Sequence, residues 1–440
     1  MISRRQFIST AATATTAAAL APTARSYARV LGANDRINFA VIGLNSRAYA
    51  HLSALKANSK DAQITHVCDV DTTILDKFAA RVQKDCDYAP ATEKDFRKVL
   101  ALKDVDAITI ATPDHWHAPM AIAGLQAGKH VYVEKPCSHN PAEGALLIAA
   151  RDKYGKLVQM GTQQRSSPHT IKIIADIHNG SIGRAYYSNA WYTNTRKSIG
   201  TGKAAPVPAT LDWDLWQGPA PRQAYKDNIQ PYNWHWFKIW GTGETLNNGT
   251  HEVDVARWAL GVDYPNSITA SGGRYAFKDD WQFYDTLTTS FTYDDKLISW
   301  DNKCCNGMKV NNRDRGTVVM GTTGSVLIDR GGYEVYDLKG QKTDEFKLGT
   351  KTASSDLVGA DSATDLHFTN FIAAIRTGEK LHAPIEVGNV AVTMLQLSNV
   401  AWETKRELHL DPKNGKILND TEAMTKYWSR TYEPGWAPKV

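Results

Sequence analysis

A glutamate and a lysine follow an apolar run in the stretch Tyr132 to Asn140, which reads YVEKPCSHN. Most such pairs at a strand end are solvated or form structural ion pairs, which contribute little to stability. In a water-poor cleft, by contrast, a cation at position 135 would orient a hydroxyl and stabilise negative charge that develops on its oxygen. Lys135 is therefore a candidate for hydroxyl chemistry if the fold places it in a cleft.

Two positions nearer the N-terminus are candidates for holding a nucleotide. Residues 43–48 read GLNSRA and keep only the first glycine and the final alanine of the G-x-G-x-x-G/A turn, which alone is a weak signal. Asn45 can adopt a left-handed backbone, although its side chain crowds a pyrophosphate more than glycine does. Asp69 ends the next apolar run, where a ribose-binding acid is expected, and its carboxylate would favour NAD over NADP by repelling a 2′-phosphate. Strand-end acids also cap helices, so Asp69 taken alone leaves both roles open.

The elements that would position these residues alternate between short β-branched runs and helical periods. The runs predict strands near residues 37–43, 62–69, 107–112, 130–134 and 157–161. The periods predict helices near residues 47–57, 72–85, 93–102, 117–127 and 141–154. This alternation predicts an α/β fold with a doubly wound parallel sheet, a Rossmann domain over residues 34–161. Such sheets bind ligands at the carboxyl ends of their strands, where Asp69 and Lys135 both lie.

The pattern changes after Gly161. A helix and a strand are expected first, then an irregular stretch to about residue 250, and then alternating strands to residue 348. We expect residues 162–363 to form a substrate-binding α+β domain with an open, mainly antiparallel sheet. Residues 364–440 are expected to form C-terminal helices and a tail that pack back on both domains.

The irregular stretch is rich in tryptophan, because six of the chain's 13 tryptophans lie between residues 191 and 240. Core packing accounts for most tryptophans, but loop tryptophans beside polar groups suit stacking on the apolar face of a sugar ring. The candidates for substrate contacts are Trp234 and Trp236, together with Arg165 and His235.

The first residues read as an export signal. Arg4 and Arg5 precede a weakly apolar stretch rich in alanine and threonine, and Ser26-Tyr27-Ala28 forms a small-residue cleavage site. This order predicts a twin-arginine signal over residues 1–28 and a periplasmic location; a basic arm with an accidental Arg-Arg pair is the alternative. No other segment approaches the ~20 apolar residues that span a bilayer, so we expect no membrane anchor.

Composition excludes several other classes of protein. The 440 residues are enough for two domains, and 42% of them are hydrophobic, as in ordinary soluble proteins. Removal of the signal, with its three arginines and no acid, lowers the formal charge from +5 to +2, which does not indicate nucleic-acid binding. The five cysteines lack metal-type spacing, so we expect neither a disulfide framework nor a metal site.

Three motifs occur in a recognisable order. Residues 111–117 read ATPDHWH at a strand end, residues 134–136 read EKP at the end of the next strand, and residues 241–254 read GTGETLNNGTHEVD at a helix start. With these motifs the chain resembles the glucose-fructose oxidoreductase / inositol dehydrogenase / rhizopine catabolism (Gfo/Idh/MocA) family from about Asn34 to the final helices. The resemblance implies an NAD-dependent oxidoreductase.

The resemblance also implies roles for matching positions. Lys135 matches the lysine that lies beside the nicotinamide and touches the reacting hydroxyl, and His251 matches the catalytic histidine. Asn247 stands where the family usually has an aspartate; an amide can bind the substrate but cannot accept its proton, so we expect His251 to be the base. The positions that match cofactor contacts are Gly43, Asn45, Ser46, Arg47, Asp69, Thr112, Pro113, Asp114, His115, Trp116, His117, Glu134, Lys135 and Gln163.

The expected reaction is oxidation of a ring hydroxyl of a sugar or glycoside to a 3-keto product, with NAD bound tightly and recycled. The hydroxyl proton and the hydride must leave in opposite directions, to a base and to the nicotinamide. One alternative is a glycoside hydrolase that uses NAD for transient C3 oxidation and elimination, as some relatives do; another is a sugar-binding protein without catalysis. A homo-oligomer, either a dimer or a tetramer, is expected because relatives often form one.

Overall fold

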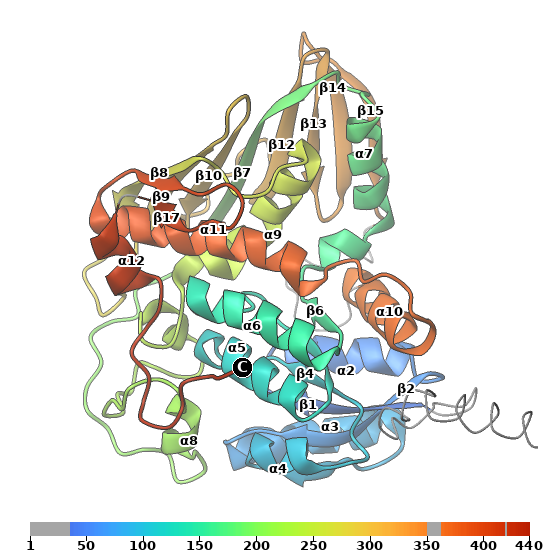
Figure 1. The fold of residues 1–440 in the computed structure, drawn as a ribbon, viewed down its shortest axis with the longest axis vertical. Coiled ribbons are helices and arrows are strands. Elements are labelled where there is room, and N and C mark those ends of the chain that lie inside the picture. Colours follow the sequence, from blue (N-terminus) through green and yellow to red (C-terminus); the bar gives the residue numbers. More distant parts are fainter. Residues whose placement is uncertain (1–35, 350–361, 419) are drawn as a thin grey trace, which may run out of the picture. The chain divides into compact units, whose positions relative to one another are not determined.

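The computed structural model describes residues 36–349, 362–418 and 420–440. Its first sheet consists of six parallel strands in the order β3-β2-β1-β4-β5-β6 (Figure 1). The strands are β1 (Ile37–Ile42), β2 (Ala62–Cys68), β3 (Ala91–Glu93), β4 (Ala107–Ile110), β5 (His130–Val133) and β6 (Val158–Met160). The helices between them are α2 (Ala48–Ala57), α3 (Thr72–Cys86), α4 (Phe96–Ala101), α5 (Asp114–Gln126) and α6 (Pro141–Tyr154). The predicted twin-arginine signal, residues 1–28, lies outside the described residues.

Local sequence explains where these elements begin. β1 is buried along its whole length, as expected for a parallel strand that is covered on both faces. Asn140 accepts a hydrogen bond from the backbone N–H of Glu143, and Pro141 opens α6 in the position that proline favours. The prediction of a helix from residue 93 was wrong. Residues 91–93 pair with β2 instead, and α4 begins only at Phe96 because Asp95 accepts from the N–H of Arg97.

The strand order reverses between β1 and β4, and this switch point opens a crevice at their carboxyl ends. Gly43, directly after β1, has a φ of +80°, and a Cβ built there would lie 2.6 Å from the backbone nitrogen of Thr112, directly beyond β4. Only glycine therefore allows the two turns to approach so closely.

The second sheet has eleven strands and is mainly antiparallel; β7 and β10 form its parallel pair. Its order is β15-β14-β13-β12-β7-β10-β9-β8-β16-β17, and β11 pairs with β7. The strands are β7 (Ala185–Thr195), β8 (Ser267–Gly273), β9 (Thr286–Thr292), β10 (Leu297–Lys303), β11 (Cys305–Asn306), β12 (Arg315–Gly321), β13 (Gly324–Asp329), β14 (Gly332–Asp337), β15 (Lys342–Lys347), β16 (Leu408–Leu410) and β17 (Ile417–Leu418). The predicted fold class, a Rossmann sheet followed by an α+β domain with an open sheet, is confirmed.

The remaining helices are α7 (Pro168–His178), α8 (Trp213–Gln217), α9 (Gly243–Leu260), α10 (Ser362–Thr377), α11 (Ile385–Thr404) and α12 (Thr421–Tyr427), with 3-10 turns η2 (Gln163–Ser166) and η3 (Asn233–Trp236). α9 packs on β7, β10 and β12. A Cβ at Gly249 would lie 2.9 Å from the indole of Trp300 in β10, so glycine lets α9 lie close against the sheet. This close packing fixes the first turns of α9, which carry Asn247 and His251.

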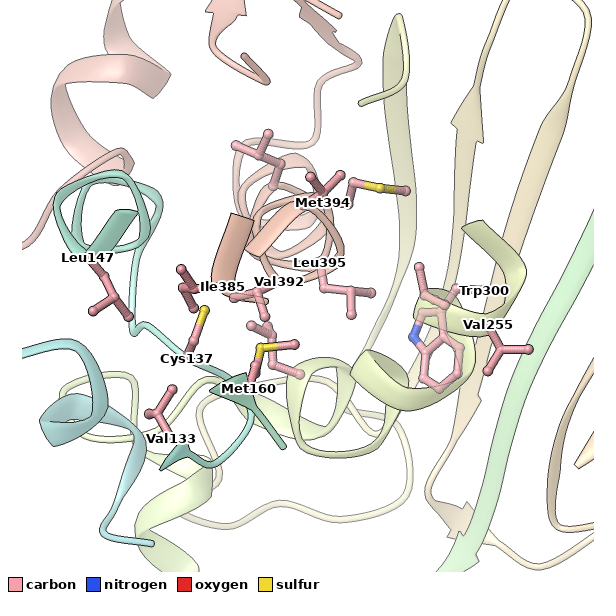
Figure 2. Close-up of a cluster of buried hydrophobic side chains, with 14 of the residues drawn as sticks. Val133, Cys137, Leu147, Met160, Val255, Trp300, Ile385, Val392, Met394 and Leu395 are labelled. Carbon is pink, nitrogen blue, oxygen red and sulfur yellow. The ribbon is translucent and has the colours of Figure 1, made fainter. Parts of the chain in front are cut away.

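α11 connects the two sheets. It contacts α6 on one side and α9 and β8 on the other, while α10 contacts α2 and η2. Figure 2 shows Val133, Leu147 and Met160 of the Rossmann domain meeting Val392 and Leu395 of α11, with Trp300 beyond them. Because one continuous apolar core joins the strands that end at the crevice to α9, residues from both domains are held in fixed positions relative to one another.

Candidate active site

A cavity of about 680 Å³ lies along the crevice, between the carboxyl ends of the first sheet and the second domain. The glycine turn and Asp69 line one part of it, and Lys135, Asn247 and His251 line another. The other predicted residues that line it are Asn45, Ser46, Arg47, Thr112, Pro113, Asp114, Trp116, His117, Glu134, Trp234 and His235.

Asp69 is fixed to the glycine turn. Its Oδ2 accepts a hydrogen bond from the backbone N–H of Leu44 at 2.7 Å, and its Oδ1 accepts one from the N–H of Asp71 at 3.0 Å. Burial raises the pKa of Asp69 to about 6, against the effect of these hydrogen bonds. Each carboxylate oxygen has two lone pairs, so each keeps one for a ribose hydroxyl. The helix-capping alternative does not apply to Asp69, because Asp71 caps α3.

The residues at this end fit a dinucleotide. Gly43 lines the cavity at the turn after β1, where a pyrophosphate is bound in folds of this kind, and the Asp69 carboxylate stands where a ribose would lie. A segment of the second domain covers the same end. The N–H of Asp212 donates to the carbonyl of Val70, and the N–H of Thr72 donates to the carbonyl of Thr210, both at 3.0 Å.

These two hydrogen bonds place Leu211, Leu215 and Trp216 in the wall of the cavity, close to Val70 and Asp71. Trp216 belongs to the tryptophan-rich stretch, and it follows the segment that is bonded to Val70 and Thr72. The sequence offered no periodic signal for this covering segment.

Replacing Asp69 with alanine is expected to weaken NAD binding by ~10-fold, as for the loss of a hydrogen bond to a charged group, and to narrow the preference for NAD over NADP. The 2′-phosphate loses a repelling neighbour in this variant. Calorimetric titration of nucleotide-free protein with both nucleotides, above pH 6, measures the change. Asp95→Ala is the matched control, because Asp95 caps helix α4 in the same domain and does not line the cavity. If Asp69→Ala kept the preference of the wild type for NAD over NADP, the only role left to Asp69 would be to fix the glycine turn.

Glu134 is held in place by three neighbours. Its Oε1 accepts from Arg47 Nε at 2.7 Å, lies 3.0 Å from His51 Nε2 and 3.4 Å from Gln163 Nε2. Burial alone would raise the pKa of Glu134, but Arg47 and His51 hold it well below its usual range. The carboxylate therefore stays charged, and it fixes the backbone from which Lys135 projects.

Lys135 meets α9 across the cavity. Its Nζ donates to the backbone carbonyl of Asn247 at 2.6 Å and to Asn247 Oδ1 at 3.3 Å. Burial lowers the pKa of Lys135 to about 8, while Glu134 and Asp114 act in the opposite direction. The structure thus brings together the lysine after β5 and the amide at the family's aspartate position.

His251 lies one turn further along α9 and is buried. Burial lowers its pKa well below the ordinary value, and the nearby cations Arg330 and Lys135 lower it further. The ring is therefore neutral at physiological pH. Within the described part of the chain its Nε2 is buried and has no hydrogen-bond partner, so its hydrogen-bonding capacity is unused.

The ATPDHWH loop borders the cavity. Of the residues 112–117 that were predicted to contact the cofactor, all except His115 line it. His115 Nε2 lies 3.0 Å from the carbonyl of Trp216, and burial lowers its pKa to about 3. Asp114 accepts a hydrogen bond from the hydroxyl of Thr242 at 2.5 Å, and this bond connects the loop to the start of α9. His115 therefore supports the covering segment from behind.

Three further predicted residues are not in the cavity wall. The guanidinium of Arg165 forms a double ion pair with Asp254 at 2.6 and 2.8 Å, which uses the groups that a substrate would need. Trp236 stacks on Trp281 with ring centroids 3.8 Å apart. Gln163 reaches the site only through Glu134. Sequence position alone could not show these partners, because each comes from a distant part of the chain.

Sequence reasoning missed a group of polar residues in the wall beside Asn247, namely Tyr192, Arg196, Tyr232, Asn248, Arg315 and Arg330. They come from the ends of β7 and β12, from the turn between β13 and β14, from the irregular stretch and from α9. The cluster of aromatic and basic residues around Tyr232 was the one available signal.

Comparison with known proteins follows this division of the chain. Residues 37–162 match the model of the oxidoreductase family with an NAD-binding Rossmann fold, Gfo/Idh/MocA. The matched span covers the six-stranded parallel sheet, so the likeness to this family lies in the first domain. It is an NAD-binding domain, as the sequence predicted.

Curated relatives match over a similar span. A glycosyl hydrolase family 109 protein from Shewanella putrefaciens is 24% identical over 162 residues, which are 36% of this chain and 35% of that protein. An alpha-N-acetylgalactosaminidase from Shewanella oneidensis is 25% identical over 161 residues, 36% of this chain and 34% of that protein. The alignments thus cover about a third of each relative.

Solved structures extend the likeness in fold to the second domain. The WlbA dehydrogenase from Bordetella pertussis, in complex with NADH and UDP-GlcNAcA, has a TM-score of 0.64 at 18% identity over 86% of this chain and 99% of that chain. A levoglucosan dehydrogenase in complex with NADH and levoglucosan has a TM-score of 0.67 at 18% identity over 85% and 99%. The likeness in fold to these two dehydrogenases therefore extends beyond the Rossmann domain.

Two other kinds of site are absent from the described residues. Among them no group of three or more histidine, cysteine or acidic side chains is placed to hold a metal ion, and the five cysteines are free. None of the helices described combines the length and the apolar character that crossing a membrane requires.

Proposed function

We propose that this protein is an NAD-dependent oxidoreductase that oxidises a ring hydroxyl of a sugar or glycoside, with a 3-keto sugar as product. The observation that carries the proposal is the meeting of Lys135 and α9 in one cavity. The lysine cation touches Asn247, His251 lies one turn beyond, and both face the space that continues to the NAD end.

The residues supply the parts of an alcohol oxidation. Lys135 orients the reacting hydroxyl and stabilises negative charge on its oxygen as the proton leaves. His251, neutral in this environment, accepts that proton. Bound NAD would supply the acceptor for the hydride. Leu211, Leu215 and Trp216 give the nucleotide end an apolar wall, which disfavours water beside a bound nucleotide.

Substrate contacts are proposed for the aromatic residues that line the cavity near Asn247. Trp234 and His235 stack on each other with ring centroids 3.6 Å apart, which gives a flat apolar surface for a sugar ring. The molecules bound with NADH in the similar structures, UDP-GlcNAcA and levoglucosan, both contain a sugar. They support the substrate class and leave the particular sugar open.

A redox-neutral glycoside hydrolase is the second candidate function, and the glycosidase names of the curated relatives favour it. In that reaction oxidation at C3 acidifies the hydrogen at C2, elimination expels the aglycone, water adds, and the ketone is reduced again. Incubation of a methyl glycoside in deuterated water separates the two reactions. Deuterium at C2 of the released sugar, without net NADH, supports hydrolysis; a keto product with one NADH per sugar supports oxidation. If neither of these products forms, both candidate functions are contradicted.

Export and assembly are also proposed. The twin-arginine pattern of residues 1–28 supports a periplasmic protein that leaves the cytoplasm folded with its cofactor bound. A homo-oligomer is proposed from the family resemblance.

The exported protein is expected to purify with substoichiometric to full NAD(H) and to turn over without added NAD. No free NAD pool is evident in the periplasm, and the segment bonded to Val70 and Thr72 covers the nucleotide end of the cavity. The measurement is nucleotide quantification after acid or base extraction of protein from the periplasm, followed by an assay with a carbonyl sugar and no supplement. An empty site with strict dependence on added NAD would contradict retention and weaken the proposed export.

A further inference from the structure

The phenol of Tyr232 lies in the cavity wall next to Asn247. Its oxygen accepts a hydrogen bond from Asn247 Nδ2 at 3.1 Å and another from Arg196 Nη2 at 3.2 Å. A tyrosine oxygen has two lone pairs and one proton to give. Both lone pairs are therefore used, and among the described residues no group accepts the phenolic proton.

Arg196 and Glu244 hold the phenol in this state. The Arg196 guanidinium lies over the ring of Tyr232, 5.4 Å from its centroid, and is paired with the Glu244 carboxylate through both Nε and Nη2. Glu244 is fully buried and is not in the cavity wall. Because the Glu244 carboxylate compensates the charge of Arg196, Arg196 can donate to the phenol while the phenol stays neutral.

Asn247 is fixed between groups of opposite kind. Its Oδ1 faces the Lys135 ammonium, while its Nδ2 donates to Tyr232 and lies 3.3 Å from Glu244 Oε1. An aspartate at position 247 would place a second carboxylate against Glu244 in a buried site, where like charges repel strongly. The amide is therefore a matched part of this arrangement, because it connects the lysine to the tyrosine without adding charge.

We propose that Tyr232 donates its phenolic proton in a hydrogen bond to a substrate hydroxyl next to the one that is oxidised, and that this bond selects the sugar. The proposal rests on the proposed function and names a specificity residue for it. Tyr232 and Lys135 are separated by a single amide group, so the two side chains serve different oxygens of one ring. Arg196, Glu244 and Asn247 position the phenol.

The chemistry of the group agrees with a donor role. Burial raises the pKa of Tyr232, while the Arg196 cation acts against the shift, so the phenol keeps its proton at neutral pH. His235 packs against the ring with centroids 4.2 Å apart, and its Nδ1 lies 2.6 Å from the carbonyl of Tyr232. The hydroxyl is thus aimed by contacts on both sides of the ring.

The test compares the binding of sugar analogues to wild type and to Tyr232→Phe. Binding to the NADH-loaded protein is measured by calorimetry, so turnover is not needed. Methyl glucoside, methyl galactoside and their monodeoxy and deoxyfluoro analogues at each ring position are titrated into wild type and Tyr232→Phe. In wild type, one deoxy position is expected to bind ~10-fold more weakly than the intact sugar, because the hydrogen bond from the Tyr232 hydroxyl is lost. In Tyr232→Phe the same position is expected to lose this difference.

Tyr187→Phe is the matched control, because the Tyr187 hydroxyl bonds Ser299 Oγ at 2.8 Å outside the cavity wall. It should discriminate as wild type does. If Tyr232→Phe does not fold, the fluoro analogues of wild type decide the matter, since a fluorine accepts weakly and should recover part of the loss at that position alone. A Phe variant with undiminished discrimination, or equal binding of all wild-type analogues, would overturn the role of Tyr232. If no sugar binds, the proposed function fails and this role fails with it.

Discussion

Replacing Lys135 with methionine is expected to lower turnover of the sugar by between ~10²-fold and ~10³-fold, the range found when one donor to a developing oxyanion is removed. Methionine keeps most of the volume of the side chain but cannot donate to the hydroxyl oxygen. NAD binding should change little, because the groups at the nucleotide end, Gly43 and Asp69, follow other strands, β1 and β2. The loss should therefore appear in kcat more than in the affinity for nucleotide.

The pH dependence of the wild type follows from the same residue. Lys135 acts as a cation, and burial lowers its pKa to about 8. The cationic form is complete well below pH 8 and is lost as the pH rises through that value, so turnover should fall on the alkaline side. His251, with its pKa well below the ordinary value, stays neutral over the same pH range, so its titration does not affect the pH profile of turnover there.

A second lysine of the same domain provides the control. Lys129 is buried, its Nζ donates to the carbonyls of Leu102 and Val105, and it does not line the cavity. Lys129→Met should lower the melting temperature and leave turnover per folded molecule unchanged. Near-normal turnover in Lys135→Met, measured as initial rates with saturating sugar, would remove the lysine from the chemistry.

Replacing His251 with glutamine is expected to lower turnover by ~10²-fold to ~10⁴-fold, the usual contribution of a general base. Glutamine keeps a polar side chain of similar reach but cannot accept the proton. Asn247 cannot replace the base, because an amide does not ionise at these pH values. The carboxylates nearby are engaged elsewhere. Glu244 is paired with Arg196 and lies behind the cavity wall, Glu134 accepts from Arg47, and Asp114 accepts from Thr242.

His169 is the matched control for this variant. It is buried, burial lowers its pKa, and it stacks on Phe346 away from the cavity. His169→Gln should affect stability alone. The check is to compare the two variants by single-turnover kinetics with bound NAD; comparable losses in both would show that the effect of His251→Gln arises from the fold.

The sequence predicted the parts of the site that follow regular elements. Asp69 and Lys135 end parallel strands, so the topology alone placed them at one edge. His251 and Asn247 share a helical face at a spacing of four residues, and the structure brings both to the cavity. The second glycine of the turn is absent, yet Gly43 keeps the close approach to Thr112 that the crevice needs.

The rest depended on contacts between distant segments. Arg165 looked available for a substrate, but Asp254 lies 89 residues away in sequence and occupies its guanidinium. Tyr232 and Leu211 lie in an irregular stretch whose path is set by a few backbone hydrogen bonds and by aromatic packing, neither of which has a period in the sequence. From the family pattern alone, an aspartate at position 247 would be tolerated. The neighbouring Glu244 carboxylate reverses that expectation.

The central claim is that NAD bound in this cavity oxidises a sugar held against Lys135 and His251. The most direct measurement is the nicotinamide absorbance of purified, NAD-loaded protein during addition of a panel of free sugars and glycosides, with Lys135→Met measured in parallel. The account predicts a rise in reduced nicotinamide with at least one sugar in the wild type, and a rate lower by ~10²-fold or more in the variant. No reduction and no glycoside cleavage by NAD-loaded wild type with any sugar of the panel, or equal rates in the two proteins, would contradict it.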